Sequence, residues 1–333
     1  MNMVVSLQDM DSRSHISLQE YCRPFIGSDN QWPNLPLPTQ PAIEWWQKWM
    51  EVTAIEQQYE SLRYFLPQLW IIPHDGACKS EIYKRLVLRG ETNIETEIKT
   101  YLKLEDRLGF SIRLTDHPCG TFPVIEMKNR NDFIDVVRCL AYRCELAQIQ
   151  SSVHAQAVSG LIHWGLIRKT NNLERAQLII LHHSPYSSLP ASSIPGKPTN
   201  DEWVEISQRW RLEHELTHLA TQRLVGEMRL NLFDELVADA LGMLKGLKFF
   251  SAELFRQGLG LNNDASTRPT GRVHTYLKGL NENDSKTACQ YVLQRANELE
   301  ILLEKGVIAN ERLTLLRYLT KQKLDQPFVA NKC

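Results

Sequence analysis

The chain has 333 residues, of which 43% are hydrophobic and 23% are charged, and these values are ordinary for a globular protein. Its 38 basic and 39 acidic side chains give a formal charge of −1, and no stretch concentrates Lys and Arg as a nucleic-acid-binding surface would. Apolar runs do not reach the ~18 residues of a membrane span, and the N-terminus lacks the basic start of a signal peptide. We therefore expect a cytoplasmic protein that binds neither nucleic acid nor a membrane.

The seven cysteines favour the same compartment. Their number is odd, and no two of them have the C-x-x-C spacing of a thiolate zinc cage. A disulfide framework is therefore not expected, and we interpret the cysteines as free thiols in a reducing environment.

Residues 1–150 are expected to form a mostly helical N-terminal region. A proline-rich arm spans residues 22–41, and Pro41 then opens a run with apolar residues at helical spacing. We interpret this stripe as core; its members are Trp45, Trp49, Val52, Ile55 and Tyr59. Two further helices are predicted near 79–89 and 93–108.

A pair of strands is predicted near residues 109–128. "FSIRLT" and "FPVIEMK" are rich in β-branched and aromatic residues, and the turn "DHPCG" lies between them. The run 131–149 then has helical periodicity, with Asn131 or Asp132 as its N-cap.

Residues 151–260 are expected to form the region that carries the chemistry. "AQLIILHH" (176–183) predicts a buried strand, and the Ser- and Pro-rich loop 184–200 follows it. A helix is predicted from a cap at Asp201 to Val225, and a second helix from Asn231. Residues 261–333 are expected to be helical, so the fold class is α+β and mainly α.

The predicted helix at 201–225 contains the sequence "HELTH". Residues four apart lie on nearly one face of a helix, so His214 and His218 can direct two imidazoles at one point. Glu215 lies beside that face and can reach a water on a metal without binding the metal itself. The alternative reading is a pair of solvated helices with ordinary charges.

A third ligand is available on the next predicted helix, in "DELVAD". Glu235 follows His218 by 17 residues, which is enough for the first helix to end and the second to return. Glu235 can then supply a carboxylate oxygen, and Asp239, one turn later, can accept the Nδ1–H of a ligand histidine. Asp234 points about 100° away from Glu235 and is not favoured as a ligand.

HELTH followed by Glu235-x-x-x-Asp239 resembles the gluzincin metallopeptidases, the thermolysin-like class, over residues 210–242. The resemblance implies a zincin-like core with a small sheet and an active-site helix pair, flanked by helical extensions. It also implies Zn²⁺ held by His214, His218 and Glu235, with Glu215 as general base and Asp239 behind a ligand. Three other segments, "AVSGLIHW", "SPYS" and "DELVADALG", are similar to an uncharacterised bacterial group of zincin-like proteins.

The predicted activity is hydrolysis of an amide bond in a peptide or protein substrate by a metal-activated water, with Glu215 as the base. A second donor must stabilise the developing oxyanion, and Tyr186 is the favoured candidate because it opens the long loop. Histidines that could serve instead are His154, His163, His182, His183 and His274. The strand at 176–183 is a candidate edge for pairing with an extended substrate.

Two alternatives stay open at this point. One is a zinc enzyme that acts on a non-peptide small molecule, because ligand geometry alone does not identify a substrate. The other is a non-catalytic interaction protein in which zinc is a structural tie between two helices. Four protein ligands without an open position would indicate the structural tie.

Overall fold

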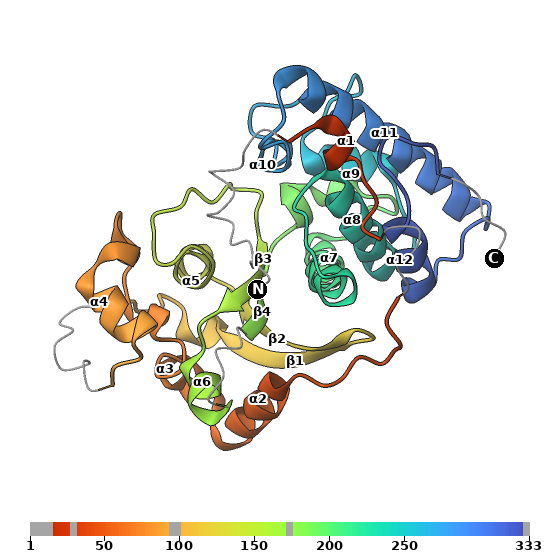
Figure 1. Cartoon of the computed structure of the whole chain (residues 1–333). Coiled ribbons are helices and arrows are strands. Elements are labelled where there is room, and N and C mark those ends of the chain that lie inside the picture. Colours follow the sequence, from red (N-terminus) through yellow and green to blue (C-terminus); the bar gives the residue numbers. More distant parts are fainter. Residues whose placement is uncertain (1–15, 27–31, 93–100, 171–175, 329–333) are drawn as a thin grey trace. The chain divides into compact units, whose positions relative to one another are not determined.

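A computed structural model describes residues 16–26, 32–92, 101–170 and 176–328 (Figure 1). The fold is mainly helical α+β, with a four-stranded mixed sheet, as the sequence predicts. Contacts divide the chain into two compact units. Unit 1 takes in residues 38–149 and 154–183, and unit 2 takes in the arm before residue 38, residues 150–153, and the chain from residue 184 onward.

Unit 1 contains the sheet and a set of short helices. Its helices are α2 (Pro41–Val52), α3 (Gln58–Leu62), α4 (Glu81–Tyr83) with a π-helical turn at Lys84–Leu88, α5 (Arg130–Ala141) and α6 (Trp164–Thr170). Its strands are β1 (Ser111–His117), β2 (Gly120–Met127), β3 (Ala155–Leu161) and β4 (Ala176–His182). The strand pair at 109–128 and the helix near 79–89 are therefore confirmed.

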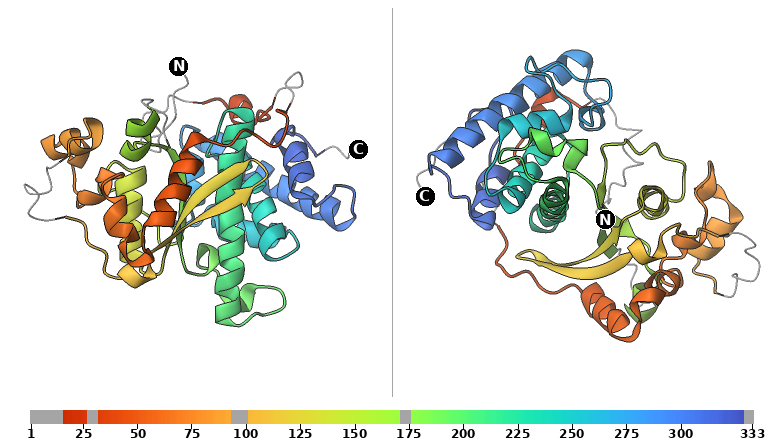
Figure 2. Two further views of the ribbon diagram at one scale, coloured as in Figure 1. Left: turned by 90° about the horizontal axis from the view of Figure 1, so that it is seen from below. Right: turned by 180° about the vertical axis from the view of Figure 1, so that it is seen from behind.

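Unit 2 is helical. Its helices are α1 (Leu18–Tyr21), α7 (Asn200–Val225), α8 (Leu232–Gly246), α9 (Ala252–Leu259), α10 (Val273–Tyr276), α11 (Glu282–Glu304) and α12 (Arg312–Thr320). Helices α7 and α8 lie side by side, and α11 and α12 pack against α8 (Figures 1 and 2). Within the described ranges, no helix is both long and apolar enough to cross a membrane.

The strand order of the sheet is β1-β2-β4-β3. β1 and β2 form an antiparallel hairpin, β2 and β4 are parallel, and β4 and β3 are antiparallel. β4 is thus an interior strand, and the prediction that residues 176–183 form a free edge is wrong. The error follows from β3, which the sequence pattern did not reveal because the strand contains Gly160 and its register shifts between Val158 and Leu161.

The aromatic stripe of α2 differs from the predicted one. The helix buries Ile43, Trp46 and Trp49, which lie three residues apart. Val52 and Ile55, predicted to continue the stripe, are 83% and 69% exposed. Ile55 and Tyr59 lie beyond the end of the helix at Val52, so helical spacing does not decide which of them faces the core, and Tyr59 is buried as predicted.

Two predicted helix boundaries also shift. Asn129, rather than Asn131 or Asp132, caps α5 by accepting the N–H groups of those two residues. Of the helix predicted at 93–108, residues 93–100 lie outside the described residues. The part from residue 101 has only a short 3-10 turn, Arg107–Gly109, so that part of the prediction is wrong.

The functional division of the chain at residues 150 and 260 stays a prediction, because the two compact units group residues by contact and not by chemistry. Unit 2 nevertheless contains every residue that the sequence assigns to the metal site and to proton transfer.

Candidate metal centre

Helix α7 is fixed at both ends by local sequence. Thr199 caps it, not Asp201, and forms a capping box in which Glu202 accepts the Thr199 backbone N–H while the Thr199 hydroxyl accepts the Glu202 N–H. The run from 200 to 225 has no Gly or Pro, and the helix ends at Gly226, whose φ of +82° is the left-handed conformation that favours glycine. His214 and His218 lie about one turn apart on this continuous helix.

Helix α8 presents the carboxylates. The Asn231 side chain caps it by accepting the Asp234 N–H at 2.9 Å. Glu235 and Asp239 follow one turn apart and are almost wholly buried, as α8 packs against α7. Two well-capped helices thus bring imidazoles and carboxylates together.

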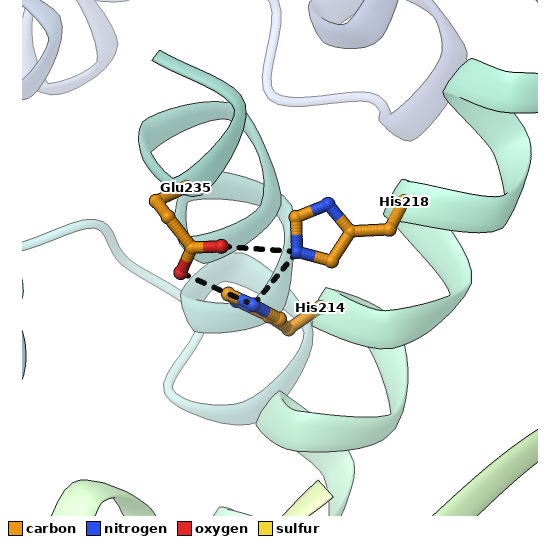
Figure 3. Close-up of side chains that lie close together, drawn as sticks. All are labelled: His214, His218 and Glu235. Atoms are coloured by element: carbon orange, nitrogen blue, oxygen red, sulfur yellow. Dashed lines mark hydrogen bonds and ion pairs between the residues drawn. The ribbon is translucent and has the colours of Figure 1, made fainter. Parts of the chain in front are cut away.

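His214, His218 and Glu235 point toward one another from the two helices (Figure 3). Nε2 of His214 lies 3.1 Å from Nε2 of His218, Oε1 of Glu235 lies 3.3 Å from Nε2 of His218, and Oε2 lies 3.6 Å from Nε2 of His214. The three side chains are buried, and among the described residues they form a group that could hold a metal ion.

The spacing of these atoms suits zinc. In a tetrahedral zinc site with bonds of about 2.0–2.1 Å, neighbouring ligand atoms lie roughly 3.3–3.4 Å apart. The two imidazole nitrogens, 3.1 Å apart, and the pair His218 Nε2 and Glu235 Oε1, 3.3 Å apart, lie close to that value. The 3.6 Å separation from His214 belongs to the other oxygen of Glu235, Oε2. Two imidazole nitrogens and one carboxylate oxygen are also a donor set that zinc accepts. The triad therefore resembles an H-E-x-x-H…E metal site in both chemistry and dimensions.

Each histidine has an aspartate at its outer nitrogen. Asp239 Oδ1 lies 2.8 Å from Nδ1 of His214, and Asp234 Oδ2 lies 3.2 Å from Nδ1 of His218. A proton on each Nδ1 would leave both Nε2 lone pairs directed at the centre of the triad. Asp234 is held in place by the backbone N–H groups of Arg229 and Leu230, which it accepts at 3.1 Å.

The carboxylates govern the charge of His218. Burial disfavours the imidazolium, but Asp234 and Glu235 outweigh burial and raise the pKa of His218 well above its usual value. Without a metal, this site thus favours a proton on His218, and a bound cation would take over its role in offsetting the two carboxylates.

Arg272, which the sequence analysis did not identify, pairs with two carboxylates of α8. Its Nη1 donates to Glu235 Oε2 at 2.9 Å, and its Nη2 donates to Asp239 Oδ2 at 2.7 Å. Burial alone would raise the pKa of both carboxyl groups, but Arg272 and His214 oppose it and the pKa values fall below their usual range. The carboxylates of α8 still outnumber this guanidinium, so a divalent cation would bring the group closer to neutrality.

Tyr186 lies beside the outer nitrogen of His214. Its hydroxyl donates to Asp239 Oδ1 and lies 3.2 Å from Nδ1 of His214, the ring nitrogen that faces away from the triad. Its ring stacks on Trp210 with centroids 3.9 Å apart, and the Trp210 N–H donates to the same Asp239 oxygen at 3.0 Å. Tyr186 thus contacts the carboxylate behind His214, and its predicted role in catalysis stays a prediction.

Glu215 is 8% exposed and follows His214 on α7. Tyr276, on α10, hydrogen-bonds Glu235, and burial together with the charge of Glu235 raises the pKa of the Tyr276 phenol well above its usual value. Glu215 acts on the same phenol with a smaller charge effect. The phenol therefore stays protonated and is a hydrogen-bond donor beside Glu235 of the triad.

The N-terminal arm supports the same region. The Tyr21 hydroxyl accepts the Leu232 N–H at 2.9 Å and donates to the Tyr276 carbonyl at 3.0 Å. The Asn231 side chain donates to the Tyr21 carbonyl at 3.2 Å. One phenol of the arm thus connects the first turn of α8 with the short helix α10.

The other predicted oxyanion donors are five histidines. His154, His163, His182 and His183 belong to unit 1, and their positions relative to the triad are not described. His274 belongs to unit 2, but it is exposed and its Nε2 lies 2.9 Å from the Arg268 carbonyl.

A protein-family model described as a family of unknown function, DUF7005, matches residues 4–177 and 166–326. The two matched segments together extend over nearly the whole chain. Neither the search of curated proteins nor the search of solved structures gave a match. The function must therefore be argued from the residues of the site.

Proposed function

The chain belongs to DUF7005, whose function is not known, and we propose that it is a zinc-dependent hydrolase that cleaves an amide bond in a peptide. The observation that carries the proposal is the convergence of His214, His218 and Glu235 at zinc-like spacing. Among the described residues this group has three members. Three protein ligands are the number that a catalytic zinc site uses, with one position left for water or substrate.

Bound zinc would supply two effects, polarising a carbonyl oxygen and lowering the pKa of a water to near 7. The protein would supply the proton transfers. Glu215, next to His214 and excluded from the ligand set, would take the proton of the attacking water and deliver it to the leaving nitrogen. The fixed outer carboxylates would keep both imidazoles oriented while this occurs.

Tyr276 is placed to assist. Its phenol is protonated and hydrogen-bonds Glu235, so a small movement would let it donate to an oxygen that becomes negative beside the triad. We propose Tyr276 for the donor role that the sequence analysis gave to Tyr186. A proton donor at this position complements Glu215, which acts as the base.

Substitution of Glu215 by Gln tests the proposal. Turnover of a quenched fluorescent peptide library should fall roughly 10²- to 10⁴-fold, the usual contribution of a general base. Zinc content should stay at the wild-type value, because Glu215 is not a ligand. Glu205→Gln, an exposed change on the same helix, is the control. Wild-type turnover by Glu215→Gln would remove Glu215 as the base.

The burial of the triad also supports two alternatives to a peptidase. His214, His218 and Glu235 are 4%, 4% and 1% exposed, which also suits a small amide substrate or a structural zinc. A structural zinc would be retained by the wild-type protein without turnover of any amide in the library. Turnover of small amides but not of peptides would indicate the small-molecule enzyme.

A further inference from the structure

The two oxygens of Glu235 have different partners. Oε1 faces His218 Nε2 at 3.3 Å, whereas Oε2 accepts a hydrogen bond from Arg272 Nη1 at 2.9 Å. Oε2 is also the oxygen nearer His214, at 3.6 Å from its Nε2. Oε1 thus faces one histidine of the triad, whereas Oε2 lies between the other histidine and a guanidinium, and Tyr276 hydrogen-bonds the same carboxylate.

Arg272 is held rigidly in this position. Its Nε donates to the Gly258 carbonyl at 3.0 Å, and its Nη2 donates to Asp239 Oδ2 at 2.7 Å. The side chain is 8% exposed, so water competes little for these bonds. A planar guanidinium with three fixed contacts cannot turn away from Glu235 without breaking the others.

The backbone before Arg272 is also constrained. Gly260, with a φ of +81°, packs so closely on Gly271 that a Cβ at residue 260 would lie 2.4 Å from the Gly271 Cα. The Gly260 carbonyl also accepts the Arg268 N–H at 2.8 Å. This close approach of two chain segments fixes where the Arg272 side chain begins.

We propose that Arg272 is a positioning residue that reserves Oε2 of Glu235, so that Glu235 offers a metal only Oε1. This inference rests on the proposed zinc site. An oxygen engaged by a charge-assisted hydrogen bond in a buried position is a poor second ligand, because binding metal would cost it the guanidinium. Glu235 would then take one coordination position instead of two, which leaves a position open for water or substrate.

The arrangement requires arginine. A guanidinium donates to two carboxylates at once through separate nitrogens, as Arg272 does to Glu235 and Asp239. Lysine keeps the charge but has a single nitrogen on a flexible chain, so it cannot hold both oxygens in the same geometry. Arg272→Lys therefore removes the positioning while it preserves the charge.

X-ray absorption of zinc-loaded wild type, Arg272→Lys and Arg268→Lys tests the proposal. Arg268 is exposed in the same loop, so its substitution is a matched control. Wild type and Arg268→Lys should each have about four nitrogen or oxygen neighbours around zinc. Arg272→Lys should still bind about one zinc per chain but have about five neighbours, because both Glu235 oxygens become available. Its zinc affinity should fall roughly 10- to 100-fold, as for loss of an outer-shell contact.

A crystal structure of the zinc-loaded wild type is a second test, which needs no variant. It shows which oxygens of Glu235 bind zinc even if Arg272→Lys does not fold. Glu235 should bind through Oε1, with Oε2 still on Arg272. Binding through both oxygens in the wild type, or identical spectra for wild type and folded Arg272→Lys, would overturn the role of Arg272 but leave the zinc site intact. Absence of zinc binding by the wild type would overturn the proposed function and this inference together.

Discussion

His163 in unit 1 and His218 in unit 2 are both buried, yet their surroundings have opposite effects on them. His163 packs edge-on against Trp45 and Trp46, with ring centroids 4.3 and 5.2 Å apart, and burial lowers its pKa to about 3. His218 lies between two carboxylates that raise its pKa well above the usual value despite burial. The same side chain is a neutral packing group in one unit, and in the other it lies among carboxylates in a group that could hold a metal ion.

The difference shows what makes a buried histidine a ligand. The Nδ1 of His163 accepts the Leu166 N–H at 3.2 Å, and among the described residues its Nε2 has no hydrogen-bond partner. The Nδ1 of His218 faces a carboxylate, and its Nε2 faces a second imidazole and a second carboxylate. Carboxylates at both nitrogens, rather than burial alone, prepare a ring to bind a cation.

The largest expected effect is loss of zinc when the imidazole of His218 in unit 2 is removed. Removal of the imidazole of His163 in unit 1 is the comparison. His218→Ala should reduce zinc content from about one atom per chain to near none, because only two ligands of the triad remain. His163→Asn should retain zinc, because that ring lies in an aromatic environment. Elemental analysis after dialysis against zinc-free buffer measures both. Zinc retained by His218→Ala would show that the triad is not the binding site.

A smaller effect is expected from the outer carboxylates. Asp239→Asn keeps an oxygen for His214 Nδ1 but removes the charge, so zinc affinity should fall roughly 10- to 100-fold. Asp234→Asn should have an effect of the same kind through His218. Competition with a chromophoric chelator measures the affinities, and Asp264→Asn, an exposed change in unit 2, is the control. An unchanged zinc affinity in Asp239→Asn would show that the charge of Asp239 does not support zinc binding by His214.

The smallest expected effect is a pH-dependent loss of folding stability that arises from His163 in unit 1. The pKa of His163 is about 3 in the folded chain and 6.5 ordinarily, so the unfolded chain takes up the proton first as the pH falls. The stabilisation is present above pH 6.5 and is lost as the pH falls toward 3, with a loss of about 2 kcal/mol between pH 7 and pH 5.

Urea unfolding at pH 7 and pH 5 measures this loss. His163→Asn should reduce the pH-dependent loss, because an amide does not titrate but can still accept the Leu166 N–H. The exposed His74→Asn should keep the wild-type loss. An equal loss in His163→Asn would assign the pH dependence to other groups.

The helical part of the site could be predicted from sequence because it depends on local periodicity. His214 and His218 share a face of α7, and Glu235 and Asp239 share a face of α8, so four-residue spacing was sufficient to propose them together. Asp234 was set aside as a ligand by the same geometry, and the structure places it at the outer nitrogen of His218. Helix geometry gives the direction of a side chain but not which ring it meets.

The remaining parts depend on contacts between distant segments. Arg272 lies 37 residues beyond Glu235 in a loop whose path is set by the approach of Gly260 to Gly271, and no sequence period reports such a contact. Tyr276 follows on a helix of four residues, too short for a periodic signal. The interior position of β4 was missed because it depends on β3, whose pairing is irregular.

Unit 2 is built from both ends of the described chain, with most of unit 1 inserted between them. The hydrogen bond from Asn231 to the Tyr21 carbonyl closes a separation of 210 residues. During synthesis the N-terminal segment around Tyr21 can therefore form these contacts only after α8 and α10 have left the ribosome. Closing so long a loop also slows folding. Metal loading would accordingly be a late event in biosynthesis, since a chain interrupted before residue 272 presents both histidines without the guanidinium that aligns Glu235.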